Sequence, residues 1–247
     1  MLTPEVAYLK LSSVRSADIP DHVVQARNTK GWIIDLRNYP SEFVVFSIGS
    51  QFVGRPTDFV RFTHGDLTEP GRFVFTPPIA LSPRPPGLRS SAWPASAMDL
   101  GKTTFADRPD FPNTPPKPDE STFQPRAAYP GKVVVLVDEV TQSAAEYTAM
   151  ALRAAGAVIV GSTTAGADGN VSNIPLPGGL RTMISGIGIF YPDKRPTQRV
   201  GIVPDIEAKP TLAGVRAGRD EVLEAGLRHI LGPDAAAAEI VSHALNH

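Results

Sequence analysis

The sequence has no cysteine among its 247 residues. Disulfides, thiolate metal ligands and a cysteine nucleophile are therefore excluded. The sequence also has no large excess of charge of either sign, since it contains 24 lysine and arginine residues and 25 aspartate and glutamate residues. This balance gives no electrostatic case for nucleic acid or an anionic membrane as a partner. No apolar run approaches the roughly 20 residues that a membrane-spanning helix needs.

Signatures of metals and cofactors are absent from the sequence as well. Its His, Asp and Glu residues are scattered without a ligand spacing such as His-Glu-x-x-His. No Gly-rich phosphate loop precedes a helix, and Gly178-Gly179 predicts a hairpin turn instead. We therefore expect neither a metal nor another cofactor. The first residues lack the basic and apolar regions of a signal peptide, and nothing indicates the oligomeric state.

Proline is abundant, with 25 residues, and many of them fall within residues 76–130. Proline is not tolerated at the centre of a sheet or inside a helix. The segment therefore predicts a long surface excursion with a few short ordered pieces. Loops of this length are usually functional or mobile, so a passive insertion and a substrate-shaping lid both remain open.

Regular structure is best defined after this excursion. Residues 132–137 (KVVVLV) predict a buried strand, residues 142–155 an Ala-rich helix, and residues 157–160 the next strand. Gly156 suits the end of the helix. A strand–helix–strand unit of about 30 residues implies parallel strands joined by a right-handed crossover.

The remaining elements complete an α/β pattern. We expect further strands at residues 6–11, 32–36, 181–185 and 188–190, and further helices at residues 21–27, 41–53, 219–231 and 234–245. The class is α/β, with a mainly parallel sheet covered by helices. We expect one domain over residues 1–247.

Ser143 is the candidate for chemistry, because it falls where a buried strand turns into a helix. A helix N-terminus carries N–H groups without partners and a partial positive charge, both of which stabilise an oxyanion. Ser143 is therefore a candidate nucleophile, with the backbone N–H of the small residue Ala144 as an oxyanion donor. The alternative is that Ser143, or Thr141, only caps the helix.

Four segments resemble motifs of peptidase family S41, in the family's order. The run Ser143-Ala144-Ala145-Glu146 is similar to Ser-Ala-Ser-Glu after an apolar strand. GWIIDLRNYPSEF is similar to Asp-Leu-Arg-x-Asn-Pro-Gly-Gly, VGSTTAGADGNV to Gly-x-x-Thr-x-Gly, and VGIVPDIEAKPT to Gly-Ile-x-Pro-Asp. The resemblance implies a ClpP/crotonase-like fold of layered sheets and helices. It also implies acyl transfer from a peptide or protein substrate to Ser143. Bacterial members of this family are often exported, and this is the only indication of the cellular location of the protein.

The resemblance also implies an oxyanion donor from the turn after Asp-Leu-Arg, which falls at Ser41. Here Ser41 and Glu42 replace the two glycines usual in the family, so we expect a narrower or differently built hole. The positions that activate the serine in the family are substituted in this sequence. One branch of the family uses a lysine, but Ala167 occupies that position in this sequence. Another branch uses His and Glu, and Gln198 occupies the position of that Glu.

Three residues remain as candidates to activate or orient the nucleophile, namely His64, Asp168 and Gln198. His64 has a suitable unperturbed pKa, and we expect it in a loop at the start of the excursion. Asp168 could act in catalysis, or Asp168-Gly169 could simply form a turn. We expect His22 in a short helix before the strand that contains Asp35, and we interpret the remaining candidates as solvated, namely His229, His243, His247, Lys132 and Lys194.

Three functions fit these patterns. The first is a serine hydrolase that cleaves peptides. The second is a non-catalytic ligand- or peptide-binding module on the same fold, which the missing lysine and the replaced glycine pair favour. The third, a crotonase-like acyl-thioester enzyme, is disfavoured because such chemistry uses no serine nucleophile, whereas the helix here opens with Ser-Ala-Ala-Glu.

Overall fold

The protein is described from a computed structural model, which covers residues 1–66, 68–69, 71–83, 128–169 and 171–245. Most of the Pro-rich excursion at 76–130 lies outside the described residues. Its described beginning contains one short strand, β5 (Ile79–Leu81). Within the described residues no helix has the length and apolar character needed to cross a membrane.

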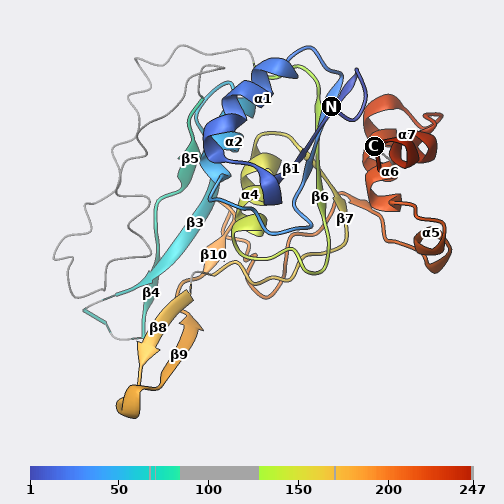
Figure 1. Cartoon of the computed structure of the whole chain (residues 1–247). Coiled ribbons are helices and arrows are strands. Elements are labelled where there is room, and N and C mark those ends of the chain that lie inside the picture. The colour runs from blue at the N-terminus through green and yellow to red at the C-terminus, as the bar shows by residue number, and fades with distance from the viewer. Residues whose placement is uncertain (67, 70, 84–127, 170, 246–247) are drawn as a thin grey trace.

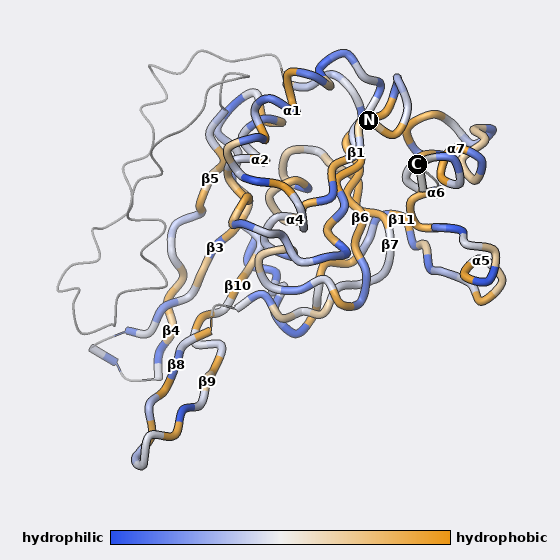
Figure 2. Tube along the Cα trace, in the orientation of Figure 1, coloured by the Kyte–Doolittle hydropathy of each residue, from blue (hydrophilic) through white to orange (hydrophobic). Residues whose placement is uncertain are grey.

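A five-stranded parallel sheet forms the centre of the molecule (Figure 1). Its strands, in spatial order, are β1 (Val6–Lys10), β2 (Gly31–Asp35), β6 (Lys132–Val137), β7 (Val158–Gly161) and β11 (Ile206–Glu207). All four neighbouring pairs are parallel. The middle strands are apolar (Figure 2) and buried, as helices on both faces require. The predicted α/β class is confirmed.

Helices cover both faces of this sheet (Figure 1). One layer contains α1 (Ile19–Gln25), α2 (Val45–Phe52) and α4 (Ala144–Ala154), and the other contains α6 (Glu221–Leu231) and α7 (Ala237–Leu245), preceded by the short α5 (Leu212–Arg216). Strand residues alternate between two apolar clusters. Trp32 and Ile34 pack with the first layer, while Ile33 packs with the second.

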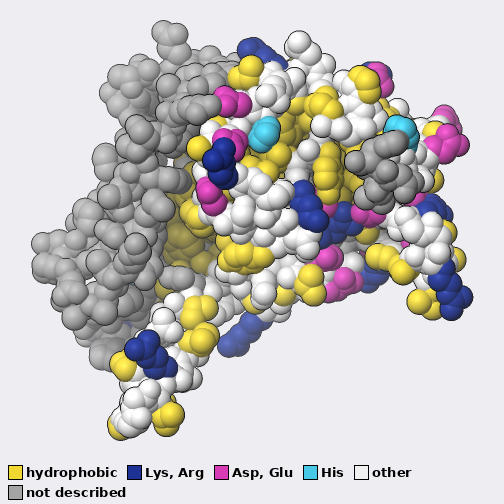
Figure 3. Space-filling view, in the orientation of Figure 1, with side chains coloured by type: hydrophobic (Ala, Val, Ile, Leu, Met, Phe, Trp, Pro, Cys, Tyr) yellow, Lys and Arg dark blue, Asp and Glu magenta, His cyan; other side chains and the backbone are white. Residues whose placement is uncertain are grey.

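Antiparallel strands surround β3 (Thr57–Gly65) beside α4. β3 pairs with β4 (Phe73–Phe75), with β5 and with β10 (Ile189–Phe190). A separate hairpin of β8 (Val171–Pro175) and β9 (Arg181–Ser185) projects from the body with exposed residues on both faces (Figures 1 and 3). Gly178 and Gly179 turn it with φ of +81° and +78°, which confirms the predicted hairpin turn.

The expected boundaries are wrong in two places that matter for the site. The helix predicted at residues 41–53 begins only at Val45, because the Ser41 N–H and hydroxyl bind main-chain carbonyls of the 11–14 segment. The helix predicted at residues 142–155 begins at Ala144. The strands β3, β4, β8 and β11 were not predicted from the sequence.

Candidate active site

Ser143 stands between the end of β6 and the first residue of α4. The turn before it is folded by Asp138, whose carboxylate accepts hydrogen bonds from both the N–H and the hydroxyl of Thr141, each at 2.9 Å. The Thr141 hydroxyl also lies 3.3 Å from the Leu36 carbonyl oxygen of the neighbouring strand. Thr141 therefore shapes the turn, and Ser143 is the N-cap residue.

The backbone of Ser143 adopts an unusual conformation, with φ +53° and ψ −120°. An ordinary N-cap residue has extended dihedrals with negative φ. A residue with a Cβ and a positive φ destabilises the fold by on the order of 1–3 kcal/mol. Such residues are found most often at functional sites. A helix cap does not require this conformation, whereas a nucleophile on a sharp strand-to-helix turn does. Ser143 is also partly exposed to solvent.

Glu146 joins two of the sequence motifs, the Ser143 run and the Gly-x-x-Thr-x-Gly segment. It is completely buried in the first turn of α4, and its carboxylate accepts hydrogen bonds from the Ser143 N–H at 3.1 Å, the Gly166 N–H at 2.7 Å and the Ala167 N–H at 2.9 Å. The Thr164 hydroxyl donates a fourth bond at 2.5 Å. From the sequence, Glu146 was identified only as part of a motif. The available signal was the Ser-x-x-Glu spacing of a capping box, which Ser143 and Glu146 form.

The Gly-Ile-x-Pro-Asp segment packs directly on the same loop. The Ile202 N–H donates to the Thr164 hydroxyl oxygen at 2.7 Å, and the Arg199 N–H donates to the Gly166 carbonyl at 2.6 Å. Gly201 has φ +83°, and a Cβ there would lie 2.5 Å from the Thr164 carbonyl oxygen. Glycine is therefore required where these two loops cross.

Asp168 turns into the protein beside this loop, with 6% of its surface exposed. The Thr197 hydroxyl donates to its Oδ2, while its Oδ1 is buried with no hydrogen-bond partner among the described residues. Burial raises the pKa of Asp168 to about 6; the Thr197 bond opposes this shift and the Glu146 charge adds to it. The alternative interpretation of Asp168-Gly169 was a simple turn, but the side chain of Asp168 is a buried acid with a perturbed pKa.

Gln198 lies over the same loop. A Cβ on Gly169 would come within 2.3 Å of Gln198 Oε1, so the amide rests against the Gly169 backbone. That oxygen is also buried without a partner in the described part of the chain. Asp168 and Gln198 are thus brought to the loop whose Ala167 carbonyl accepts the Ser143 N–H at 3.1 Å. No hydrogen bond between either side chain and the Ser143 hydroxyl occurs among the described residues.

The two predicted oxyanion donors differ in their geometry. Ala144 is the first residue of α4 and is partly exposed, and an N–H at that position has no acceptor within its helix. The Ser41 N–H instead donates to the Leu11 carbonyl at 3.0 Å, and the Ser41 hydroxyl donates to the Val14 carbonyl at 2.6 Å. In this conformation the Ser41 N–H is directed to Leu11.

His64 lies on β3, in register with Val74 of β4, and not in the loop that the sequence predicted. Its ring is exposed, with Nδ1 at 3.1 Å from the Gly65 carbonyl oxygen. A strand position fixes the direction of the side chain more tightly than a loop would. The structure therefore provides less freedom for His64 to reach Ser143 than the sequence suggested.

The other lysine and histidine candidates are held elsewhere. The Lys132 ammonium donates to the His229 carbonyl at 2.6 Å, at the start of β6, whereas Ser143 follows the end of that strand. The Lys194 ammonium lies 5.3 Å from the Phe75 ring centroid. His22 is in α1 and His243 is in α7. His247 lies outside the described residues.

The Asp-Leu-Arg motif braces the sheet against α6. Arg37 donates to both carboxylate oxygens of Asp35, at 3.0 and 2.6 Å, and to both of Asp220, at 2.8 and 2.7 Å. The Tyr8 hydroxyl donates to Asp35 at 2.7 Å, and Asp220 caps α6 through the Leu223 N–H. These charged residues fix the start of the turn that leads to Ser41.

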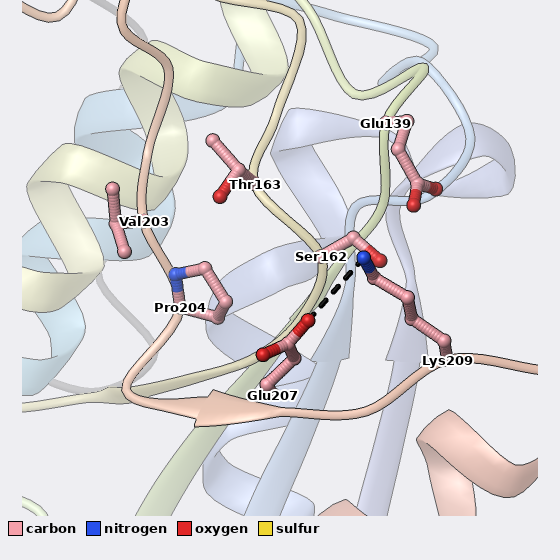
Figure 4. A pocket seen from close by; sticks show the side chains of 7 residues that line it. All are labelled: Glu139, Ser162, Thr163, Val203, Pro204, Glu207 and Lys209. Atoms are coloured by element: carbon pink, nitrogen blue, oxygen red, sulfur yellow. Dashed lines mark ion pairs between the residues drawn. The ribbon is translucent and has the colours of Figure 1, made fainter.

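A pocket of about 210 Å³ opens near the carboxyl ends of β6 and β7 (Figure 4). Glu139, Ser162 and Lys209 line one side of it, and the Lys209 ammonium lies 3.3 Å from the Glu207 carboxylate. Hydrogen bonds from its own N–H and from Ser162 lower the pKa of Glu139. This pocket neighbours the Ser143 turn but does not include Ser143. The described residues contain no group of three or more His, Asp or Glu side chains that could hold a metal ion.

Comparisons with known proteins agree with the motifs. Residues 83–208, more than half of the chain, match peptidase family S41. A crystal structure from Parabacteroides merdae ATCC 43184 superposes with a TM-score of 0.66 and 19% identity, over 92% of this chain and 61% of that one. Mature CPAF complexed with lactacystin gives a TM-score of 0.61 and 14% identity, over 96% and 52% of the two chains.

The photosystem II D1 C-terminal processing protease gives a TM-score of 0.50 and 18% identity, over 94% of this chain and 47% of that one. At these identities the likeness establishes the fold alone, and the chain spans about half to three fifths of these structures. No curated protein matches the chain. The family match and the shared fold lead to one conclusion, which is that the chain belongs to peptidase family S41.

Proposed function

We propose that the chain is a serine peptidase in which Ser143 forms the acyl-enzyme with a peptide or protein substrate. One observation carries this proposal. Ser143 has a positive φ of 53° at the N-terminus of an 11-residue helix and is nevertheless partly open to solvent. Such strain persists only where the surrounding structure holds it, and it is typical of functional positions.

The chemistry follows from this position. Ser143 Oγ attacks the substrate carbonyl carbon and gives its proton to a base. The carbonyl oxygen then carries the negative charge beside the Ala144 N–H and the positive end of the α4 dipole. The C–N bond breaks, and the amine leaves with the transferred proton. Water then attacks the acyl-enzyme, releases the carboxylic acid and restores the Ser143 hydroxyl.

We assign the base to Asp168, with Gln198 holding the loop around it. Three features support this assignment. Asp168 follows Ala167, whose carbonyl is bound by the Ser143 N–H; one carboxylate oxygen has no partner among the described residues; and its pKa of about 6 suits proton transfer near neutral pH. Catalytic contacts often tighten only when substrate binds, so the missing direct bond to Ser143 does not exclude the role.

Hydrolysis of fluorescently labelled casein tests the proposal. We expect the wild-type chain to release fluorescence, Ser143→Ala to fall to background, and Asp168→Asn to lose at least about 100-fold, a factor typical of a lost general base. Ser13→Ala is the matched control, because it changes an exposed serine that is distant in sequence from Ser143, and it should retain full activity. If His64→Gln abolishes turnover while Asp168→Asn remains active, the base is His64.

A non-catalytic peptide-binding module is the second candidate. Ala167 occupies the position where one branch of the family has its lysine, and no His or Lys side chain of the described residues bonds to Ser143. Saturable binding of casein peptides without turnover, equal in the wild type and Ser143→Ala, would favour this function over hydrolysis.

A further inference from the structure

Glu146 is a buried carboxylate that no cation neutralises among the described ion pairs. Burying an ionised carboxylate is costly unless hydrogen bonds replace the lost water. The protein supplies four donors to this one group, which exceeds what a helix cap requires. A capping box uses the carboxylate for a single bond to the N-cap N–H. The three additional bonds therefore need another explanation.

The four donors divide evenly between the two carboxylate oxygens. Oε1 accepts from the Thr164 hydroxyl and the Gly166 N–H, both from the loop after β7. Oε2 accepts from the Ala167 N–H of the same loop and from the Ser143 N–H. The Ser143 N–H also points to the Ala167 carbonyl. Glu146 thus ties the strained residue to the loop that continues into Asp168.

We infer that Glu146 is a positioning residue that holds Ser143 in its positive-φ conformation by fixing loop 164–167 against the first turn of α4. This inference rests on the proposed function only where Ser143 reactivity is the readout. The hydrogen-bond network extends to a further segment, because the Thr164 hydroxyl accepts a hydrogen bond from the Ile202 N–H at 2.7 Å. One carboxylate therefore sets the relative positions of three segments that are distant in the sequence.

A carboxylate is required at this position because every partner is a donor. An ionised carboxylate is an acceptor at both oxygens, whereas a glutamine amide offers one acceptor oxygen and an NH₂ group that donates. Glu146→Gln keeps the shape of the side chain but turns that NH₂ group toward two of the four donors. Buried donors without an acceptor are unfavourable, so the loop should move away from α4.

The test compares Glu146→Gln with Glu224→Gln in the full chain. Glu224 is the matched control: it is equally buried, but it lies on α6 and is paired with Arg219 and Arg228. Two quantities are measured, namely amide hydrogen exchange and the rate of labelling by a fluorophosphonate probe. In Glu146→Gln we expect exchange at Gly166 and Ala167 to rise at least 10-fold, with the amides of β6 unchanged.

We also expect the labelling rate to fall at least 10-fold in Glu146→Gln, and kcat for casein to fall while KM changes less than about threefold, as for a lost transition-state contact. Glu224→Gln should lower Tm but leave loop exchange and labelling at wild-type values. If Glu146→Gln fails to fold, Thr164→Val removes one of the four donors to Glu146, together with the acceptor of the Ile202 N–H, and should give a smaller change of the same kind.

The outcomes separate this inference from the proposed function. If the folded wild type is not labelled, the hydrolase proposal fails, but faster exchange at Gly166 and Ala167 in Glu146→Gln still supports the positioning role. Unchanged exchange in that variant overturns the role. Faster exchange combined with an unchanged labelling rate overturns the connection to Ser143.

Discussion

The Thr197 hydroxyl donates a hydrogen bond to the buried carboxylate of Asp168, whose other oxygen has no partner among the described residues. Burial therefore dominates, and the pKa of Asp168 rises to about 6. Between about pH 4 and 6 the folded state keeps a proton that the unfolded chain has already released. The contribution of Asp168 to stability is thus largest at acid pH and falls as the pH rises through 6.

Asp168→Asn should remove this pH dependence, because asparagine does not ionise. The free energy of unfolding is compared between the variant and the wild type at each pH. From pH 4 to pH 8 this difference should shift in favour of the variant by about 2–3 kcal/mol, since each pKa unit corresponds to about 1.4 kcal/mol. Urea unfolding at several pH values measures the difference. Asp193→Asn, at an exposed position paired with Arg195, is the control and should show no such gain. A difference independent of pH would contradict the assignment.

The ion pairs of Arg37 with Asp35 and Asp220 predict that stability depends on pH with the opposite sign. Burial opposes ionisation of Asp220, but hydrogen bonds from Arg37 outweigh it and lower the pKa of Asp220. Its contribution is therefore present above about pH 4 and lost as the pH falls through the lowered folded value. Asp220→Asn should cost about 1–3 kcal/mol at pH 7, as expected for bonds to charged groups, and much less at pH 2.

Urea unfolding of Asp220→Asn at both pH values checks this. Glu69→Gln, which breaks an exposed pair with Arg72, should change stability by less than about 0.5 kcal/mol at either pH. An equal loss for Asp220→Asn at pH 7 and pH 2 would show that its charge is not what stabilises the brace.

Gly201 and Gly218 provide a matched pair of substitutions. Both have positive φ, +83° and +67°, but a Cβ on Gly201 would lie 2.5 Å from the Thr164 carbonyl oxygen, while one on Gly218 meets nothing within 4 Å. Gly218→Ala should cost about 1–2 kcal/mol through its dihedrals alone. Gly201→Ala should cost at least about 2 kcal/mol more, because backbone atoms must move. Equal losses in thermal unfolding would contradict the close approach of these two loops.

The sequence predicted the elements with strong local patterns. The bounds of β6 and β9 are those expected, because KVVVLV and RTMIS are bounded by turn residues. β3 was missed because TDFVRFTHG mixes polar and apolar residues and adjoins the Pro-rich segment. β8 was missed because VSNIP is exposed on both faces and thus shows no alternation.

The candidate site residues could be picked out from the sequence where a motif contains them, and not where tertiary contacts determine their surroundings. Ser143 could be found from its place between a buried strand and a helix. The burial of Asp168 depends on the distant Thr197, and the direction of the Ser41 N–H depends on Leu11. Glu146 resembles an ordinary surface residue in an Ala-rich helix. Three of the hydrogen bonds to Glu146 form only when loop 164–167 folds onto α4, and they cannot be predicted from the local sequence.

The reactivity of Ser143 can be measured directly with a fluorophosphonate probe, followed by intact mass and peptide mapping. We predict a single adduct on the folded wild-type chain, located at Ser143 and absent from Ser143→Ala. A folded wild type that takes up no probe, or one labelled equally in Ser143→Ala, would contradict the account.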